Sequence, residues 1–151
     1  MLVNVITGER FRTFVLPVAS EDKAALRKGW RFDWLKESKV RPVYKLTTSE
    51  NPYILHGLVS SEPDVGFMFM HLVERAGYGD GVRLYDGIPQ SLVAFVCQQS
   101  FEFGFEGVVA FDSKSLLFRY YEKTLHAKRL GNSSRMIVDT QTAFHLINVW
   151  L

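Results

Sequence analysis

Ten residues constrain the fold more strongly than any others: Arg83-Leu84-Tyr85-Asp86-Gly87-Ile88-Pro89-Gln90-Ser91-Leu92. A short extended piece turns at Gly87 and enters a helix, because proline suits the first turn of a helix. The free N–H groups at a helix start carry partial positive charge and bind phosphate well. Gly87 would let the backbone approach a ligand closely. The stretch therefore predicts a phosphate site, although most helix starts of this kind bind nothing.

The chain after this stretch alternates between helices and strands. The expected elements are a helix over 90–103, a strand over 107–111, a helix from 112 or 113 to 124, a strand over 135–139 and a helix over 140–150. The first helix is apolar nearly all round, which predicts a central position. The second carries Leu116, Leu117, Tyr120 and Tyr121 along one face. The last repeats its apolar residues at helical spacing.

The chain before the central stretch reads mostly as strands. The expected elements are a strand over 14–18, a helix over 21–28, an extended piece over 30–34, a charged connection over 36–41, strands over 43–46 and 53–60 joined as a hairpin, a strand over 67–73 and a glycine-rich loop over 77–81. A break is expected at 61–64. No linker or repeat divides the chain, so residues 1–151 are predicted to form one α/β domain with a mixed sheet.

The composition is that of an ordinary globular protein. The 151 residues are 47% hydrophobic and 23% charged, with a net charge of +2, which excludes intrinsic disorder and collagen-like repeats. One cysteine excludes an internal disulfide. The apolar start of the chain is too short for a signal peptide, and no run approaches the roughly 20 residues of a membrane span. We therefore expect a cytoplasmic protein without membrane partners.

Few side chains have the spacing of a known catalytic centre. The four histidines include no pair at metal-ligand spacing, so no metal is expected. Cys97 lies inside the apolar helix, where a buried thiol is inert. A nucleophile elbow of the form Gly-x-Ser-x-Gly and a Walker loop are both missing from the sequence.

The second half of the chain resembles the GNAT superfamily of acetyl-CoA-dependent N-acetyltransferases. Gly87 takes the first glycine position of the family signature Gln/Arg-x-x-Gly-x-Gly/Ala, and Leu92 takes its later leucine. Tyr121-Glu122-Lys123 looks like the family's Tyr-Glu-Lys, and residues 102–108 look like its helix end and following strand. The resemblance covers roughly residues 42–140, whereas residues 1–41 match poorly.

The resemblance implies a mostly antiparallel central sheet flanked by helices, and a site for acetyl-CoA. The strand that ends at Leu72 and Val73 would diverge from the strand at 107–111 and pair with the pantetheine arm. The remaining cofactor contacts that it implies are Gly87, Ile88, Gln90 and Ser91, which would hold the pyrophosphate by backbone N–H groups, and Ser113.

The resemblance also implies a reaction. Tyr121 would protonate the leaving thiolate, and Glu74 would act, directly or through a water molecule, as the base for an amine that attacks the thioester directly, without a metal. The alternative reading of Tyr121 is a core aromatic, and that of Glu74 is a solvated partner of Arg75. Leu84 and Pro89 depart from the family signature. A protein that binds coenzyme A or another ligand without acetyl transfer therefore stays open as an alternative.

The acceptor and the oligomeric state have no signature in the sequence. The acceptor is expected to be a small-molecule or peptide amine. The last third of the chain is basic, since residues 113–135 hold six Lys or Arg and one Glu. Coenzyme A phosphates would be attracted by such a face. A nucleic-acid or protein interaction module is the third reading, but no nucleic-acid motif accompanies the basic residues, which disfavours a nucleic-acid partner.

Overall fold

The computed structural model describes residues 1–77 and 83–151. Seven strands of these residues form the main sheet, in the order β3-β4-β5-β6-β8-β10-β9. Their bounds are Thr13–Pro17 (β3), Val43–Thr48 (β4), Gly57–Pro63 (β5), Met68–Arg75 (β6), Val109–Asp112 (β8), Arg135–Val138 (β10) and Lys128–Arg129 (β9). Neighbouring strands are antiparallel except β6 and β8, which are parallel. The predicted mixed, mostly antiparallel sheet is confirmed.

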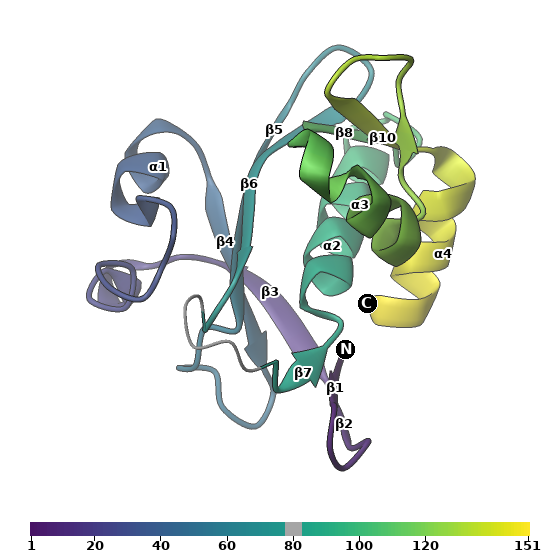
Figure 1. Ribbon diagram of the computed structural model, residues 1–151. Helices are drawn as coiled ribbons and strands as arrows, with labels where there is room; N and C mark the ends of the chain where they lie inside the picture. The colour runs from purple at the N-terminus through teal and green to yellow at the C-terminus, as the bar shows by residue number, and fades with distance from the viewer. Residues whose placement is uncertain (78–82) are drawn as a thin grey trace.

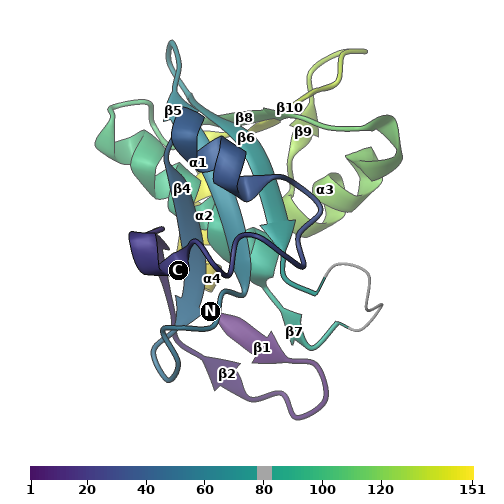
Figure 2. The same cartoon turned by 90° about the vertical axis from the view of Figure 1, so that its left-hand side faces the viewer.

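Helices cover both faces of this sheet (Figures 1 and 2). They are α1 (Trp34–Val40), α2 (Ile88–Glu102), α3 (Phe118–Leu125) and α4 (Thr140–Trp150), with 3-10 turns η1 (Ser20–Asp22) and η2 (Ser115–Leu117). The helix α1 lies on one face, and α2, α3 and α4 lie on the other. A second sheet joins β1 (Leu2–Asn4), β2 (Arg10–Phe11) and β7 (Tyr85–Asp86).

The main core lies between the sheet and α2. The α2 residues Leu92, Val93, Val96 and Cys97 are completely buried there, which confirms the predicted central helix. A smaller core lies on the opposite face, where Trp34 of α1 packs with Val43 and Leu58 of the sheet. The Trp34 side chain is completely buried there. The sheet is therefore covered on both faces.

The N-terminal segment differs from its prediction. The helix expected over 21–28 is only the single turn η1, and the expected charged connection over 36–41 is largely the helix α1. The aromatic alternation at Trp30, Phe32 and Trp34 does not mark a strand. It places two rings edge-on against Trp34, with ring centres 6.5 and 6.2 Å away. Asp33 then caps α1 by accepting a hydrogen bond from the N–H of Lys36.

Other boundaries shift without changing the topology. The strand β5 begins at Gly57 rather than Tyr53 and continues through the predicted break at 61–64 as far as Pro63. The helix expected from 112 or 113 to 124 is split into η2 and α3. The strands β1, β2 and β9 were not predicted. The glycine-rich loop expected at 77–81 lies, except for Gly77, outside the described residues.

A buried ion pair fastens the N-terminal segment to the sheet. The Nζ of Lys45, on β4, donates to both carboxylate oxygens of Asp22 at 2.8 and 2.7 Å. The N–H of Ala19 also donates to Asp22, at 2.8 Å. Asp22 is 6% exposed and Lys45 is 9% exposed, so both charges lose most of their contact with water on folding. Their mutual attraction and hydrogen bonds offset this desolvation cost.

Candidate active site

The strands β6 and β8 diverge soon after they meet. They pair in parallel only at Met68 with Val109 and at Phe69 with Ala110. The strand β6 then runs on to Arg75, while β8 pairs with β10 on its other side until Asp112. Among the described residues no strand therefore lies beside the later half of β6 on this side. The divergence predicted for these two strands is confirmed.

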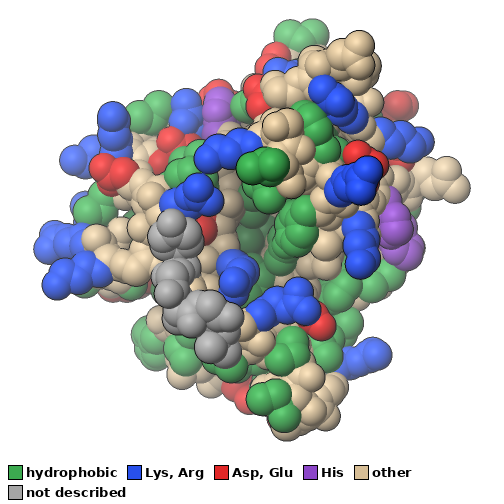
Figure 3. Space-filling view, viewed as in Figure 1, with side chains coloured by type: hydrophobic (Ala, Val, Ile, Leu, Met, Phe, Trp, Pro, Cys, Tyr) green, Lys and Arg blue, Asp and Glu red, His purple; other side chains and the backbone are tan. Residues whose placement is uncertain are grey.

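A cleft opens at this divergence. It comprises two adjoining cavities of about 450 and 190 Å³, which share Arg31, Phe32, Val73, Leu117 and Tyr121. Glu74, Arg75, Pro89, Leu92 and Tyr120 complete the larger cavity. The smaller cavity is completed by Met70, His71, Leu72, Phe111, Asp112, Ser113 and Lys114. Figure 3 shows the hollow lined by hydrophobic side chains, with Lys and Arg side chains around it.

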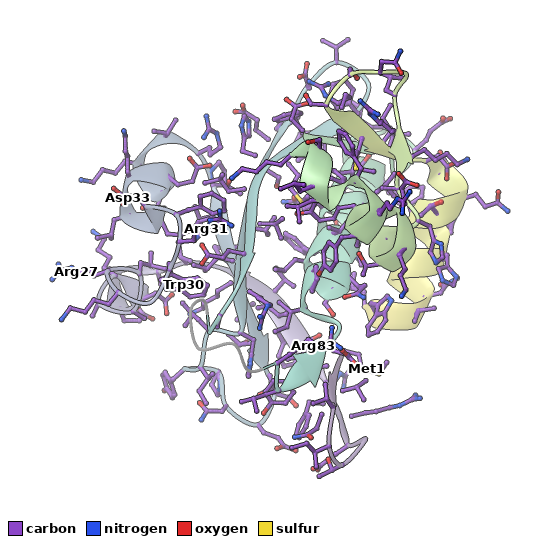
Figure 4. The ribbon with its side chains drawn as sticks, in the orientation of Figure 1. Met1, Arg27, Trp30, Arg31, Asp33 and Arg83 are labelled. Carbon is purple, nitrogen blue, oxygen red and sulfur yellow. The ribbon has the colours of Figure 1, made fainter. Side chains whose placement is uncertain are left out.

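One wall of the cleft is the segment that precedes α1, and Glu74 holds it in place. The Glu74 carboxylate accepts hydrogen bonds from the N–H of Arg31 (2.6 Å), the N–H of Phe32 (3.1 Å) and the Nε1 of Trp34 (3.0 Å). Glu74 is 8% exposed. Figure 4 shows Arg31 between the α1 segment and the strands of the sheet. The carboxylate oxygens of Glu74, the predicted base, are thus engaged by three donors of this wall.

A β-bulge in β6 shapes the floor of the cleft. Ser60 faces Leu72 and Ser61 faces Met70, so His71 is the extra residue. The N–H of Leu72 donates to the Oγ of Ser60 at 3.2 Å, and this hydroxyl donates to the Oε2 of Glu37 at 2.5 Å. The bulge turns Leu72 toward the α1 side of the sheet and Val73 toward the α2 side.

The predicted acid, Tyr121, lies in the cleft. Its ring packs edge-on against Phe111 of β8 and Tyr120, with ring centres 5.0 and 5.2 Å away. Burial, followed by the proximity of Tyr120, raises the pKa of Tyr121 above its ordinary value. Its phenol therefore stays protonated at neutral pH and is able to donate a proton. Burial also raises the pKa of Tyr120, against the opposing charges of Arg75 and Arg83.

The start of α2 reaches the cleft through Pro89 and Leu92. The predicted pyrophosphate contacts lie less favourably. Ser91 is completely buried, and its N–H donates to the carbonyl of Gly87 at 2.9 Å, so this N–H is not free for a phosphate. Gly87 and Ile88 are also buried, and Gln90 is half-buried. Of the four residues expected to hold phosphate, Ser91 is therefore the least suited to bind it.

The structure shows why glycine is required at position 87, which could not be predicted from the sequence. Its φ is +101°, and a Cβ there would lie 2.5 Å from the Trp150 ring and 2.6 Å from the Met1 carbonyl oxygen. Close packing of the chain ends against α2, rather than a ligand, therefore requires glycine at this position. A larger residue here would disturb the core as well as any bound phosphate.

Gly87→Ala is expected to destabilise the fold by about 2–4 kcal/mol, since backbone strain adds to overpacking. Urea unfolding followed by circular dichroism measures the loss. Gly104→Ala is the matched control, because Gly104 has a φ of +80° with nothing within 4 Å of the added Cβ. Equal losses in the two variants would contradict the packing explanation.

The other predicted cofactor contacts fall in the cleft. Leu72, Val73 and Ser113 line it, although the N–H of Leu72 is engaged by Ser60 and that of Ser113 donates to the Ser134 carbonyl at 2.9 Å. Sequence reasoning missed Arg31 and Phe32, which local patterns placed in a strand. It also missed His71, because the bulge that directs its side chain depends on contacts distant in sequence.

Two expectations concern cysteine and metals. Cys97 is completely buried, as predicted, and burial raises the pKa of its thiol to about 12. In residues 1–77 and 83–151, no group of three or more His, Cys, Asp or Glu side chains is arranged to hold a metal ion. Over the same residues, no helix is long and apolar enough to cross a membrane.

No protein-family model and no curated protein sequence matches this chain. Solved structures do match. AtaTR bound with acetyl-CoA has a TM-score of 0.60 at 14% identity, covering 89% of this chain and 98% of that chain. Aminoglycoside acetyltransferase AAC(6')-Ib, in complex with coenzyme A and kanamycin, has a TM-score of 0.61 at 14% identity, covering 88% and 98%. The KacTA–DNA complex has a TM-score of 0.57 at 12% identity, covering 91% and 99%.

These similarities establish the fold. They span nearly the whole of each chain, and the matched structures include GNAT acetyltransferases. The fold expected from the sequence resemblance is therefore confirmed. At such low identity a shared fold does not fix an activity, which depends on the residues of the cleft.

Proposed function

We propose that this protein transfers an acetyl group from acetyl-CoA to an amine. The observation that carries the proposal is the cleft between β6 and β8, with Tyr121 in its wall. The fold neighbours AtaTR and AAC(6')-Ib were crystallised with acetyl-CoA or coenzyme A, which supports the same co-substrate here. The alternating polar backbone of an unpaired strand edge suits the amide groups of a pantetheine arm.

The proposed cofactor path runs through both adjoining cavities of the cleft. The pantetheine would lie along Val73 and Leu72, with Ser113 near its inner end. The phosphates would lie toward the first turn of α2, where the N–H groups of Ile88 and Gln90 belong to the helix start and Pro89 has none. Arg75 lines this part of the cavity, and Arg83 lies near Tyr120. Their charges would favour the anionic end of coenzyme A.

The proposed chemistry is direct attack of a neutral amine on the thioester. The attacking nitrogen must lose a proton, and the sulfur must gain one as the C–S bond breaks. Tyr121 supplies the proton to sulfur, because it lies in the cleft and a phenol is protonated at neutral pH. Glu74 contributes by fixing the Arg31–Phe32 wall through its three hydrogen bonds. No step requires a metal ion.

Two other functions stay as alternatives. A protein that binds coenzyme A without transfer is consistent with the Pro89 and Leu84 departures from the family signature. A nucleic-acid interaction module is the second alternative, and the basic residues in the last third of the chain support it only weakly. Lys128 pairs with Asp139 and Arg135 with Asp112, each at 2.8 Å, and Arg129 stacks on the Phe118 ring. Half of the six cations are thus engaged within the protein.

Acetyl-CoA is expected to stabilise the protein against heat. At a hundredfold excess over Kd, the stabilisation should be about 2.7 kcal/mol. Differential scanning calorimetry with acetyl-CoA, and with ATP and NAD as controls, measures it. Transfer is then tested by thiol release from acetyl-CoA with polyamines, amino acids and peptides as acceptors. No shift at millimolar acetyl-CoA would remove the proposed co-substrate. Binding without transfer to any amine would favour the non-catalytic alternative.

A further inference from the structure

We propose that His71 is the general base that removes the proton from the acceptor amine, and that Glu62 positions its ring. The inference rests on the proposed acetyl transfer. It names a residue to remove the proton from the attacking amine, whereas Tyr121 supplies the proton to the departing sulfur. His71 is the extra residue in the bulge of β6.

His71 lines the same small cavity as Tyr121. Its Nε2 lies 2.7 Å from the Oε1 of Glu62 on the neighbouring strand β5, and its ring packs edge-on against Phe69 at 4.6 Å between ring centres. The ring is therefore held on two sides. In the neutral ring, an Nε2–H that donates to the Glu62 carboxylate leaves the lone pair on Nδ1. In the described part of the chain, Nδ1 has no hydrogen-bond partner.

The two groups approach the cleft from opposite faces of the sheet. Tyr121 belongs to α3 and packs on the core that faces α2. His71 lies on the α1 side with Glu62, whose Oε1 is 4.0 Å from the Nε of Arg41 at the end of α1. A thioester carbonyl in the gap would thus have a base on one side and an acid on the other. Direct attack uses both groups, because the amine adds to one face of the planar carbonyl and loses a proton there, while the departing sulfur gains a proton from the acid.

The proton balance closes without another reactant. The neutral amine nitrogen forms a bond to the acetyl carbon and passes one proton to Nδ1 of His71. The C–S bond breaks with its electron pair on sulfur, and the thiolate takes the proton of the Tyr121 hydroxyl. His71 then loses its proton to water and Tyr121 regains one from water. The products are the acetylated amine and coenzyme A as its thiol.

The carboxylates that line the cleft in the described residues are less suited to this task. Glu74 already accepts three hydrogen bonds. Asp112 accepts a hydrogen bond from the Nε of Arg135 at 2.8 Å. Histidine is also the side chain that ordinarily exchanges a proton near neutral pH. The charged groups around His71 are Glu62 and Arg41 from the α1 side, Arg135 over Phe69, and Arg31, Asp112 and Lys114 in the cavity.

The test is turnover of acetyl-CoA with the best amine of the acceptor panel. His71→Gln is expected to lower kcat by about 100-fold or more, with Kd for acetyl-CoA unchanged. Added imidazole is expected to restore part of the activity of His71→Ala, which a purely structural role would not allow. Glu62→Gln is expected to lower kcat less than His71→Gln, since the base remains but its orientation is lost.

His145→Gln is the matched control, because His145 lies on α4, packs against the His126 ring and is not among the described residues that line the cleft. It should keep wild-type kcat. An active wild type whose His71→Gln variant retains more than a third of kcat would overturn the assignment, and so would His71→Ala that imidazole does not rescue. A wild type that binds acetyl-CoA but acetylates nothing would instead overturn the proposed transfer itself.

Discussion

Tyr121→Phe is expected to lower acetyl transfer by about 100-fold or more while leaving acetyl-CoA binding unchanged. The substitution removes only the hydroxyl that would protonate the leaving thiolate, and general acids contribute effects of this size. The phenylalanine ring keeps the contacts of Tyr121 with Phe111 and Tyr120. Steady-state kinetics separate the two effects, because the loss should fall on kcat and not on Kd.

Tyr120→Phe is the matched control for this experiment. Tyr120 is the neighbouring residue on α3, is 42% exposed and lines only the larger cavity. Adjacent helix positions point about 100° apart, so its hydroxyl is directed elsewhere. Equal turnover in wild type and Tyr121→Phe would remove the acid assignment. A larger loss in Tyr120→Phe would exchange the roles of the two tyrosines.

Lys45→Met is expected to cost about 3–5 kcal/mol of unfolding free energy, because it leaves the buried Asp22 carboxylate without its cation. The double variant Lys45→Met with Asp22→Asn should recover most of this loss. The asparagine oxygen can still accept from the N–H of Ala19 while the buried charge is removed. Urea unfolding measures both variants. The cleft wall should loosen in parallel, since this pair fastens the segment that leads to Arg31.

Lys23→Met is the control for this pair. Lys23 is exposed next to Asp22 in sequence, and its loss should change stability by less than about 0.5 kcal/mol. If Lys45→Met costs no more than Lys23→Met, Asp22 must be hydrated, and the ion pair does not fasten the N-terminal segment.

The elements that could be predicted from the sequence are those formed by local patterns. The apolar helix α2, the apolar strands β6 and β8 and the periodic helix α4 each carry their signal within one short window. The order of these elements along the chain, together with the motifs at Gly87 and Tyr121, indicated the resemblance to acetyltransferases. The divergence of β6 from β8 and the place of Tyr121 then follow from that order.

The wall and the floor of the cleft could not be predicted in the same way. The alternation of Trp30, Phe32 and Trp34 resembles a strand, yet the Glu74 carboxylate and the Trp34 ring hold these residues as a loop and a helix start. The bulge at His71 depends on Ser60 and Glu37, which are far from it in sequence. Tertiary contacts therefore decide which side chains reach the substrate.

The start of α2 shows how one local pattern can serve two purposes. The sequence connects Gly87 with phosphate binding, whereas the structure packs Trp150 and Met1 against it. Both uses depend on the missing Cβ. Substitution at Gly87 alone therefore cannot separate a ligand role from a packing role, and the ligand must be observed directly.

A crystal structure of the protein with acetyl-CoA tests the central claim most directly. The proposal predicts electron density for the pantetheine between β6 and β8, with the sulfur within hydrogen-bonding reach of the Tyr121 hydroxyl and the acetyl carbonyl between Tyr121 and His71. Density for the cofactor at another surface, or an empty cleft in crystals grown at saturating acetyl-CoA, would contradict it.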